Sequence, residues 1–245
     1  MQPHSLFISD LHLSPQRQDL CDAFQRYCDR AVGAENLYIL GDLSDAWVGD
    51  DDDAETALLI KSTLRKLVDA GTNVQLMTGN RDFLMGQQLA DECGLTLLKD
   101  PSLVELYGRK LLLLHGDSLC IDDAEYMAFR AQIQNPDAQA LLMTQSLEDR
   151  RNLAAQLRQQ SQSANATKTE DIMDVNQVEV SRQLQAHNVS LMIHGHTHRP
   201  NIHELGDGSK RYVLGDWDTL GWHIIANEEN MRLESFNLSD FSPTL

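Results

Sequence analysis

The stretch Leu37-Tyr38-Ile39-Leu40-Gly41-Asp42 decides the fold, because four apolar residues run without interruption into a glycine and a carboxylate. A short apolar run bounded by a turn residue is typical of a strand buried on both faces. Open α/β sheets place their ligands at the carboxyl edge of such strands. We therefore expect a central parallel strand that delivers Asp42 to a functional site.

Four further apolar runs end in groups that can bind metal. Residues 5–9 lead into Asp10-Leu11-His12, residues 73–77 into Gly79-Asn80-Arg81-Asp82, residues 111–114 into His115-Gly116-Asp117, and residues 191–193 into His194-Gly195-His196-Thr197-His198. One such piece alone is weak, but their shared position after a strand predicts a common site. Two divalent ions about 3.5–4 Å apart need a bridging carboxylate surrounded by imidazole, carboxylate and amide ligands. These strand ends supply that set, and we expect His194 to support its loop rather than bind metal.

The charge balance restricts the class of partner. Twenty basic and thirty-seven acidic residues give a net charge of −17 over 245 residues. Such a chain has no general basic footprint for nucleic acid, so we expect no nucleic-acid partner and a phosphate met locally by metal. A chain of this length can bury one substantial core, and we expect one core with an insertion.

The cysteines and the apolar runs predict a cytoplasmic protein. Cys21, Cys28, Cys93 and Cys120 show no CxxC pairing, which favours buried free thiols in a reducing compartment over disulfides or zinc. The first residues lead directly into a strand pattern without a signal-like segment, and no apolar run reaches the roughly 18 residues of a spanning helix.

Periodicity along the chain predicts an α/β core. Helical patterns at residues 16–31 and 57–67 alternate with strands through residue 98, which indicates a mainly parallel sheet. Residues 103–107 and 110–114 predict an antiparallel hairpin that brings His115 to the same edge. Residues 190–193, 202–205, 211–214, 223–226 and 231–236 predict short strands of an antiparallel second sheet.

Two polar regions leave alternatives open. We interpret Asp50-Asp51-Asp52-Asp53 as a solvated run before a helix, in preference to a metal site. The segment 122–171 reads as a helical insertion over the metal edge, between core parts 1–121 and 172–245. Its leucines and Met143 at positions 141–157 form an apolar face beside Arg150, Arg151 and Arg158. Shallow membrane contact and ordinary packing explain that face equally well.

The motifs ISDLH, LGDL, GNRD, LHGD and HGHTH resemble those of the calcineurin-like metallophosphoesterases. The resemblance implies a four-layer α/β/β/α sandwich and two Mn²⁺ ions per chain. It assigns one metal to Asp10, His12, Asp42 and His198, and the other to Asp42, Asn80, His115 and His196, with Asp42 as the bridge. Such ions acidify a shared water and neutralise phosphoryl oxygens.

The GNRD motif departs from the wider family, in which many members carry GNH. Arg81 therefore stands where an imidazole is common. A guanidinium can clamp a phosphate through two hydrogen bonds but is a poor general acid. The site suits a leaving group that departs without protonation, such as a phosphate monoester released from a pyrophosphate.

A closer resemblance covers almost the whole chain. The runs LYILGDL, AWVGDDD, GNRDFL, ELYGRKLLLLHGDSLCIDDAEY, IMDVNQ and HGHTHRP resemble the bacterial UDP-2,3-diacylglucosamine diphosphatases of lipid A synthesis. This implies water attack on the uridine-side phosphorus, which gives UMP and 2,3-diacylglucosamine 1-phosphate, and a cap that holds two acyl chains at the cytoplasmic face of the inner membrane. The implied catalytic residues are Asp42, Asn80, Arg81 and His115. The implied substrate contacts are Asn80, Arg81, Asp123, Ser161, Asn165, Lys168 and His196.

Two other functions fit parts of the sequence. A phosphodiesterase for soluble nucleotides would use the same metals, but Ser161, Asn165 and Lys168 at four- and three-residue spacings on one helical face argue against it. A metal-binding scaffold without catalysis would ordinarily lack some ligands, and all seven positions are present.

Overall fold

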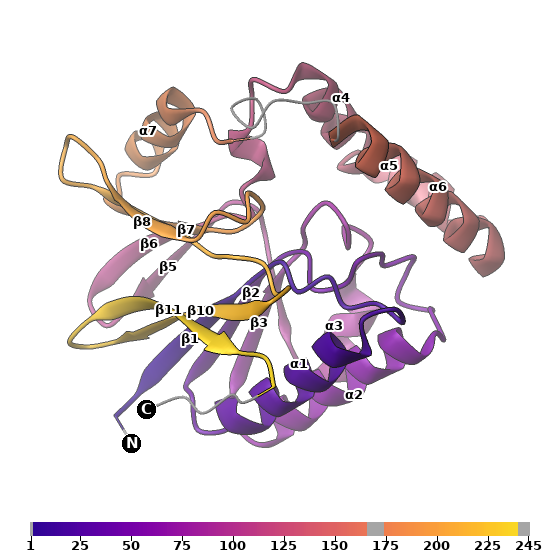
Figure 1. The fold of residues 1–245 in the computed structure, drawn as a ribbon, viewed down its shortest axis with the longest axis horizontal. Coiled ribbons are helices and arrows are strands. Elements are labelled where there is room, and N and C mark those ends of the chain that lie inside the picture. Colours follow the sequence, from indigo (N-terminus) through magenta and orange to yellow (C-terminus); the bar gives the residue numbers. More distant parts are fainter. Residues whose placement is uncertain (1, 166–173, 240–245) are drawn as a thin grey trace.

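The computed structural model describes residues 2–165 and 174–239. Two sheets lie face to face, and helices cover the outer face of each one (Figure 1). The layers follow one another as helices, six-stranded sheet, five-stranded sheet and helix, which confirms the predicted α/β/β/α sandwich. Among the described residues, no helix has the length and hydrophobicity that crossing a bilayer requires.

The first sheet contains the parallel strands that were predicted. Its strands are β1 (His4–Ile8), β2 (Asn36–Leu40), β3 (Asn73–Met77), β4 (Thr96–Leu98), β10 (Leu220–Asn227) and β11 (Met231–Asn237), in the order β11-β10-β1-β2-β3-β4. Strands β1 to β4 pair in parallel, whereas β10 runs antiparallel to β1, with His4 opposite Asn227. The parallel strands therefore all end at one edge, where the loop after β2 carries Asp42.

The second sheet is mixed rather than antiparallel. Its strands are β5 (Ser102–Leu106), β6 (Arg109–Leu113), β7 (Leu191–His194), β8 (Asn201–Glu204) and β9 (Lys210–Val213), in the order β5-β6-β7-β9-β8. The β5–β6 hairpin is confirmed, and β7 pairs in parallel with β6 and β9. The prediction that the last-quarter strands form one antiparallel sheet is therefore wrong, since β10 and β11 join the first sheet. Short turns indicate which neighbours form hairpins, but they do not show which distant strand accepts the hairpin.

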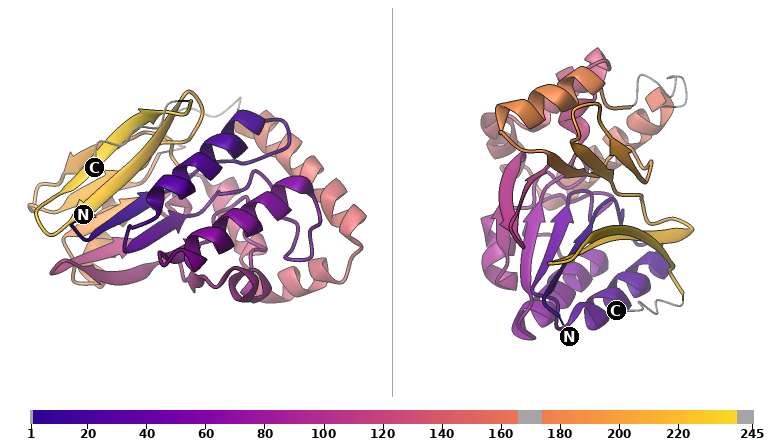
Figure 2. Two further views of the ribbon diagram at one scale, coloured as in Figure 1. Left: turned by 90° about the horizontal axis from the view of Figure 1, so that it is seen from below. Right: turned by 90° about the vertical axis from the view of Figure 1, so that its left-hand side faces the viewer.

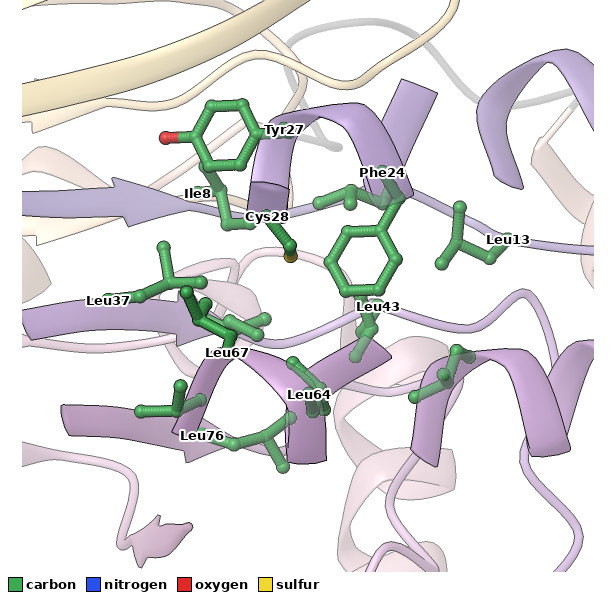
Figure 3. Packing of buried hydrophobic residues seen from close by; sticks show 14 of the residues in the cluster. Ile8, Leu13, Phe24, Tyr27, Cys28, Leu37, Leu43, Leu64, Leu67 and Leu76 are labelled. Carbon is green, nitrogen blue, oxygen red and sulfur yellow. The ribbon is translucent and has the colours of Figure 1, made fainter. Parts of the chain in front are cut away.

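Helices enclose both outer faces. α1 (Gln18–Ala31), α2 (Glu55–Asp69) and α3 (Gln87–Cys93) cover the first sheet, and Phe24 and Leu64 pack with Leu37 of β2 (Figure 3). α7 (Gln177–Ala186) covers the second sheet through Val180 and Leu184. The stacking of these layers is visible at the right of Figure 2. The four cysteines are buried and free, as predicted.

Three helices stand to one side of the stacked layers. They are α4 (Ala124–Ile133), α5 (Pro136–Met143) and α6 (Leu147–Asn165), at the upper right of Figure 1. They fall within the segment expected to be helical. Arg150 on α6 is buried and donates to Asp51 and to the carbonyl of Val48, so α6 is attached to the loop after β2.

The acidic run before α2 is solvated only in part, because Asp50 and Asp52 are buried while Asp51 and Asp53 are exposed. Asp50 is buried and accepts hydrogen bonds from the indole of Trp47 (3.0 Å) and the backbone amide of Leu89 (2.9 Å), so it caps the start of α3. Asp52 is also buried and, with Asp53, pairs with Arg151 of α6. The solvated interpretation is wrong for Asp50 and Asp52, whereas Asp51 and Asp53 are exposed; the arginine partners of residues 51–53 lie about a hundred residues further along the chain.

Candidate metal centre

The loops after β1 and β7 bring three predicted ligands together, which are Asp10, His12 and His198. Nε2 of His12 lies 3.2 Å from Nε2 of His198, and Oδ1 of Asp10 lies 3.5 Å from that same nitrogen of His198. The ring nitrogens of His12 and His198 face each other beside the buried carboxylate of Asp10. The lone pairs of these three side chains are suited to bind one cation. These three side chains have donor atoms within 4.8 Å of one another.

A second set of donors forms around Asn80. Its Oδ1 lies 2.9 Å from Nε2 of His115 and 3.0 Å from Nδ1 of His196. Asp42 lies between the two sets, with Oδ1 3.7 Å from Nε2 of His115 and Oδ2 3.9 Å from Nδ1 of His12. The structure thus brings together all seven residues that the sequence suggested, and Asp42 lies between the two sets.

The backbone at these residues is strained. Asp10, His12, Asp42, His196 and His198 all have positive φ, between 49° and 67°, and they are five of the seven described non-glycine residues with that property. Such conformations cost of order 1–3 kcal/mol each and persist only where surrounding contacts hold them. The strain marks this edge as a functional site, because each left-handed residue turns its side chain toward the same centre.

Buried hydrogen bonds hold the ligand loops in place. Asp82 accepts from the backbone amides of Asp42, Leu43, Ser44 and Gly79, at 2.7 to 3.4 Å, so one carboxylate joins the loops after β2 and β3. The loops approach so closely that a Cβ on Gly79 would lie 2.6 Å from the amide nitrogen of Asp42. Nδ1 of His115 donates to the carbonyl of Leu40 (2.9 Å), which turns Nε2 toward the centre.

Burial and mutual charge shift the pKa values of these ligands. Burial raises the pKa of Asp42 to about 7, and the neighbouring carboxylates of Asp82 and Asp10 add to the rise. Burial alone would lower the pKa of His115, but the carboxylates of Asp42, Asp10 and Asp117 raise it to about 9. Burial lowers the pKa of His196 to about 4. Buried carboxylates crowded at one site favour positive charge there, and a divalent cation supplies such charge.

His194 differs from the other histidines of its motif. It is fully buried, and its ring nitrogens face the carbonyl of Gly195 (2.8 Å) and a guanidinium nitrogen of Arg211 (3.1 Å). Both nitrogens are therefore engaged within the loop, in keeping with the supporting role expected for this residue.

A mostly apolar cavity of about 240 Å³ lies beside the donors, between the core loops and the separate helices. The core side contributes Asp45, Trp47, Asn80, Arg81, Phe83 and Leu84, and the helical side contributes Tyr126, Phe129, Leu142, Leu153, Ala154, Leu157, Arg158 and Ser161. The cavity therefore adjoins the metal donors through Asn80, and its lining combines many apolar side chains with charged ones such as Arg81 and Arg158.

The expected substrate contacts divide into three groups. Asn80, Arg81 and Ser161 line the cavity, and His196 faces the donors beside Asn80. Asp123 is buried and caps α4 by accepting from the amide of Tyr126 (3.0 Å), outside the described cavity lining. Asn165 ends α6, but its side chain lies outside the part that the structure describes, as does the whole of Lys168.

Sequence reasoning missed two residues at this site. The ring of Tyr126 lies 5.5 Å from that of His196, and its hydroxyl donates to Asp117 (3.0 Å). Asp45 lies 3.9 Å from the ring of His12 and pairs with Arg158. Asp45 could have been found as a second carboxylate three residues beyond Asp42, and Tyr126 as the last residue of the quoted run ELYGRKLLLLHGDSLCIDDAEY, three residues after Asp123.

Comparisons with known proteins agree with this geometry. The family model of the calcineurin-like phosphoesterases matches residues 4–200. UDP-2,3-diacylglucosamine hydrolases from Marinobacter nauticus and Cellvibrio japonicus are both 48% identical to the chain, covering 97% and 96% of it and 99% and 100% of their own lengths. A dimetal phosphatase from Danio rerio shares the fold, with a TM-score of 0.53 at 11% identity and 96% coverage of each chain. The chain therefore belongs to the calcineurin-like phosphoesterase family, within the group of its UDP-2,3-diacylglucosamine hydrolases.

Proposed function

We propose that this enzyme hydrolyses the pyrophosphate bond of UDP-2,3-diacylglucosamine by water attack on the uridine-side phosphorus. The products would be UMP and 2,3-diacylglucosamine 1-phosphate, as in lipid A synthesis. The observation that carries the proposal is a mostly apolar cavity whose lining includes Asn80, one of the proposed metal donors, together with Arg81. A substrate that fits both has a charged diphosphate at one end and hydrocarbon at the other.

The donor set fits a pair of divalent ions, for which we propose Mn²⁺. Asp10, His12 and His198 would hold one ion, Asn80, His115 and His196 the other, and Asp42 would bridge them. Hard oxygen donors mixed with imidazole favour such ions over those that prefer thiolate. When bound, the ions supply Lewis-acid polarisation of the phosphoryl oxygens and acidify the attacking water.

Arg81 is proposed to clamp the diphosphate. Its Nε lies 3.9 Å from Oδ2 of Asp42 and has no hydrogen-bond partner within the described chain, and the residue lines the cavity. A buried guanidinium with open donors beside the reacting centre is suited to an anionic ligand. Arg81→Ala should retain both metals and lower kcat/KM about a hundredfold, whereas loss of metal from this variant would contradict the assignment.

We propose that the segment 122–171 acts as a cap that holds the acyl chains. Leu153 and Leu157 of α6 and Phe129 of α4 line the cavity, and Ser161 stands at its polar side. Two arginines of α6 pair with the core rather than face outward toward lipid headgroups. Arg158 pairs with Asp45, and Arg151 pairs with Asp52 and Asp53. These contacts favour packing as the main role of the α6 face.

Membrane contact is a separate proposal. Leu141 is 68% exposed and Met143 40% exposed on α5, beside the cavity that would receive a lipid. We propose that α5 touches the cytoplasmic face of the inner membrane peripherally, which would shorten the transfer of acyl chains from bilayer to cavity. Co-sedimentation with anionic vesicles should fall in Leu141→Asn, and equal sedimentation would contradict contact at α5.

Substrate comparison tests the central proposal. The purified enzyme with Mn²⁺ should hydrolyse UDP-2,3-diacylglucosamine far faster than a UDP-sugar without acyl chains, since binding energy from the remote chains is available only to the former. Equal kcat/KM for the two would favour a soluble nucleotide phosphodiesterase. Metal binding without hydrolysis of either substrate would indicate a metal-binding scaffold without catalysis.

A further inference from the structure

Asp45 connects the metal centre to the separate helices. Its backbone amide donates to the carbonyl of Leu13 (3.1 Å), which fixes the loop after β2 against the loop after β1 that carries His12. Its Oδ2 accepts from Nε of Arg158 (2.9 Å), and its Oδ1 lies 2.6 Å from Nη2 of that guanidinium. The same Oδ1 lies 3.9 Å from Nδ1 of His12. One carboxylate thus faces a proposed metal ligand on one side and α6 on the other.

The imidazole of His12 lacks a fixed acceptor for its second nitrogen. Nε2 faces His198, whereas Nδ1 is buried and has no hydrogen-bond partner within the described residues. A histidine that binds metal through one nitrogen almost always donates its other N–H to a carboxylate or carbonyl, which fixes the ring. The ion-pair contacts of Nδ1 are with Asp42 and Asp45, both at 3.9 Å. Because Asp42 is assigned as the bridging ligand, Asp45 remains as the acceptor for His12.

We propose that Asp45 and Arg158 are positioning residues that couple the docking of α6 to the first metal position. Asp45 orients the imidazole of His12, and Arg158 holds Asp45 in the orientation that permits this. The inference rests on the proposed function, since it takes His12 as a metal ligand. It adds that the cap helix contributes to metal binding before substrate arrives.

The other arginines of α6 provide a matched comparison. Arg151 also pairs with core carboxylates, but its partners Asp52 and Asp53 have no contact with a proposed metal ligand in the described chain. Arg151→Gln therefore removes an ion pair between α6 and the core. It leaves in place the contacts of Arg158 with Asp45 and of Asp45 with His12. A purely structural role for Arg158 predicts equal effects of Arg151→Gln and Arg158→Gln.

Mn²⁺ binding in the absence of substrate tests the coupling directly. Calorimetric titration should show two Mn²⁺ equivalents in the parent protein, and Asp45→Asn and Arg158→Gln should each weaken one of them about 10- to 100-fold. Arg151→Gln should match the parent, and Asp45→Glu and Arg158→Lys should recover most of the affinity because they keep the charges. Unchanged Mn²⁺ affinity in Asp45→Asn would overturn the proposal. Weakening in Asp45→Asn but not in Arg158→Gln would overturn the part played by α6.

Hydrogen exchange supplies an independent measurement. Coupling between two sites is reciprocal, so Mn²⁺ should slow backbone exchange around Arg158 in the parent and in Arg151→Gln, but not in Asp45→Asn. If Mn²⁺ left the rate of backbone exchange in α6 of the parent protein unchanged, the proposal would be contradicted. If Arg158 served only to bind substrate phosphate, Arg158→Gln would raise KM and leave both measurements unchanged. Failure of the proposed function is distinguishable, because it would appear as a parent protein that binds no Mn²⁺ or does not hydrolyse the acylated substrate.

Discussion

Two interfaces meet at the cavity, and they are built differently. At the strand edge, buried groups hold one another through hydrogen bonds, as where Asp82 accepts four backbone amides. At the contact between α6 and the core, Arg150 is buried, but Arg151 and Arg158 are partly exposed and pair with carboxylates such as Asp45. Exposed pairs of this kind contribute about 0–1 kcal/mol each, whereas a buried group left without its partner costs several times more. The strand edge that carries the metal donors is therefore expected to tolerate few substitutions, and the contact between α6 and the core is expected to tolerate more.

The largest effect is expected at the residue shared by both metal positions. Asp42→Ala removes the bridging carboxylate, and the remaining buried imidazoles cannot hold two cations close together. We expect metal content to fall toward zero and kcat/KM to fall by at least about 10⁴-fold. Elemental analysis and kinetics on the purified variant provide the measurement. A variant with full metal and activity would refute the bridging assignment, and circular dichroism serves as the control for folding.

A smaller but still severe effect is expected from the carboxylate behind the ligands. Asp82→Asn keeps the size of the side chain but replaces one acceptor oxygen with a donor that faces backbone amides. The loops after β2 and β3 should lose their alignment, and metal affinity or kcat/KM should fall about 10- to 100-fold. A loss no larger than that of Arg151→Gln would show that the strand edge is as tolerant as the contact between α6 and the core, contrary to the comparison.

The same comparison explains how much of the molecule the sequence could predict. The ligands were found because each closely follows its own strand, so local order places Asp10, Asn80 and His115 at strand ends, although β6, which precedes His115, lies in the second sheet. The contact between α6 and the core was not predicted, because the partner of Asp51 is Arg150, 99 residues away. In the sequence, a carboxylate whose arginine partner is that distant cannot be distinguished from a solvated one. The placement of β10 failed for a similar reason, since a strand can pair with any exposed edge. Contacts fixed by neighbouring sequence are predictable in this chain, and those fixed by docking are not.

A buried histidine away from the metal edge shows burial outweighing a nearby carboxylate, that of Glu234. His223, whose Nδ1 lies 3.1 Å from the hydroxyl of Tyr27, has a pKa lowered from 6.5 to about 4, mainly by burial. Between these values the unfolded chain binds the proton more readily, so stability falls as pH decreases from 6.5 to 4, by about 3 kcal/mol. In His223→Gln, urea unfolding should show a correspondingly smaller loss between pH 7 and pH 4. An unchanged loss would mean that His223 is not buried in its neutral form.

The smallest effect, and the most selective, is expected inside the cavity. Ala154 of α6 lines the cavity, so Ala154→Phe places a ring where an acyl chain is proposed to lie. Hydrophobic pockets discriminate by about 1–3 kcal/mol per misplaced group, and α6 can yield in part because Arg151 and Arg158, two of the three arginines that attach it, are partly exposed. We expect kcat/KM for the diacylated substrate to fall about tenfold, with a smaller change for a UDP-sugar without acyl chains and none in Mn²⁺ affinity. Equal losses for both substrates would place the acyl chains elsewhere, whereas a loss as large as that of Asp82→Asn would mean that α6 is held as rigidly as the strand edge.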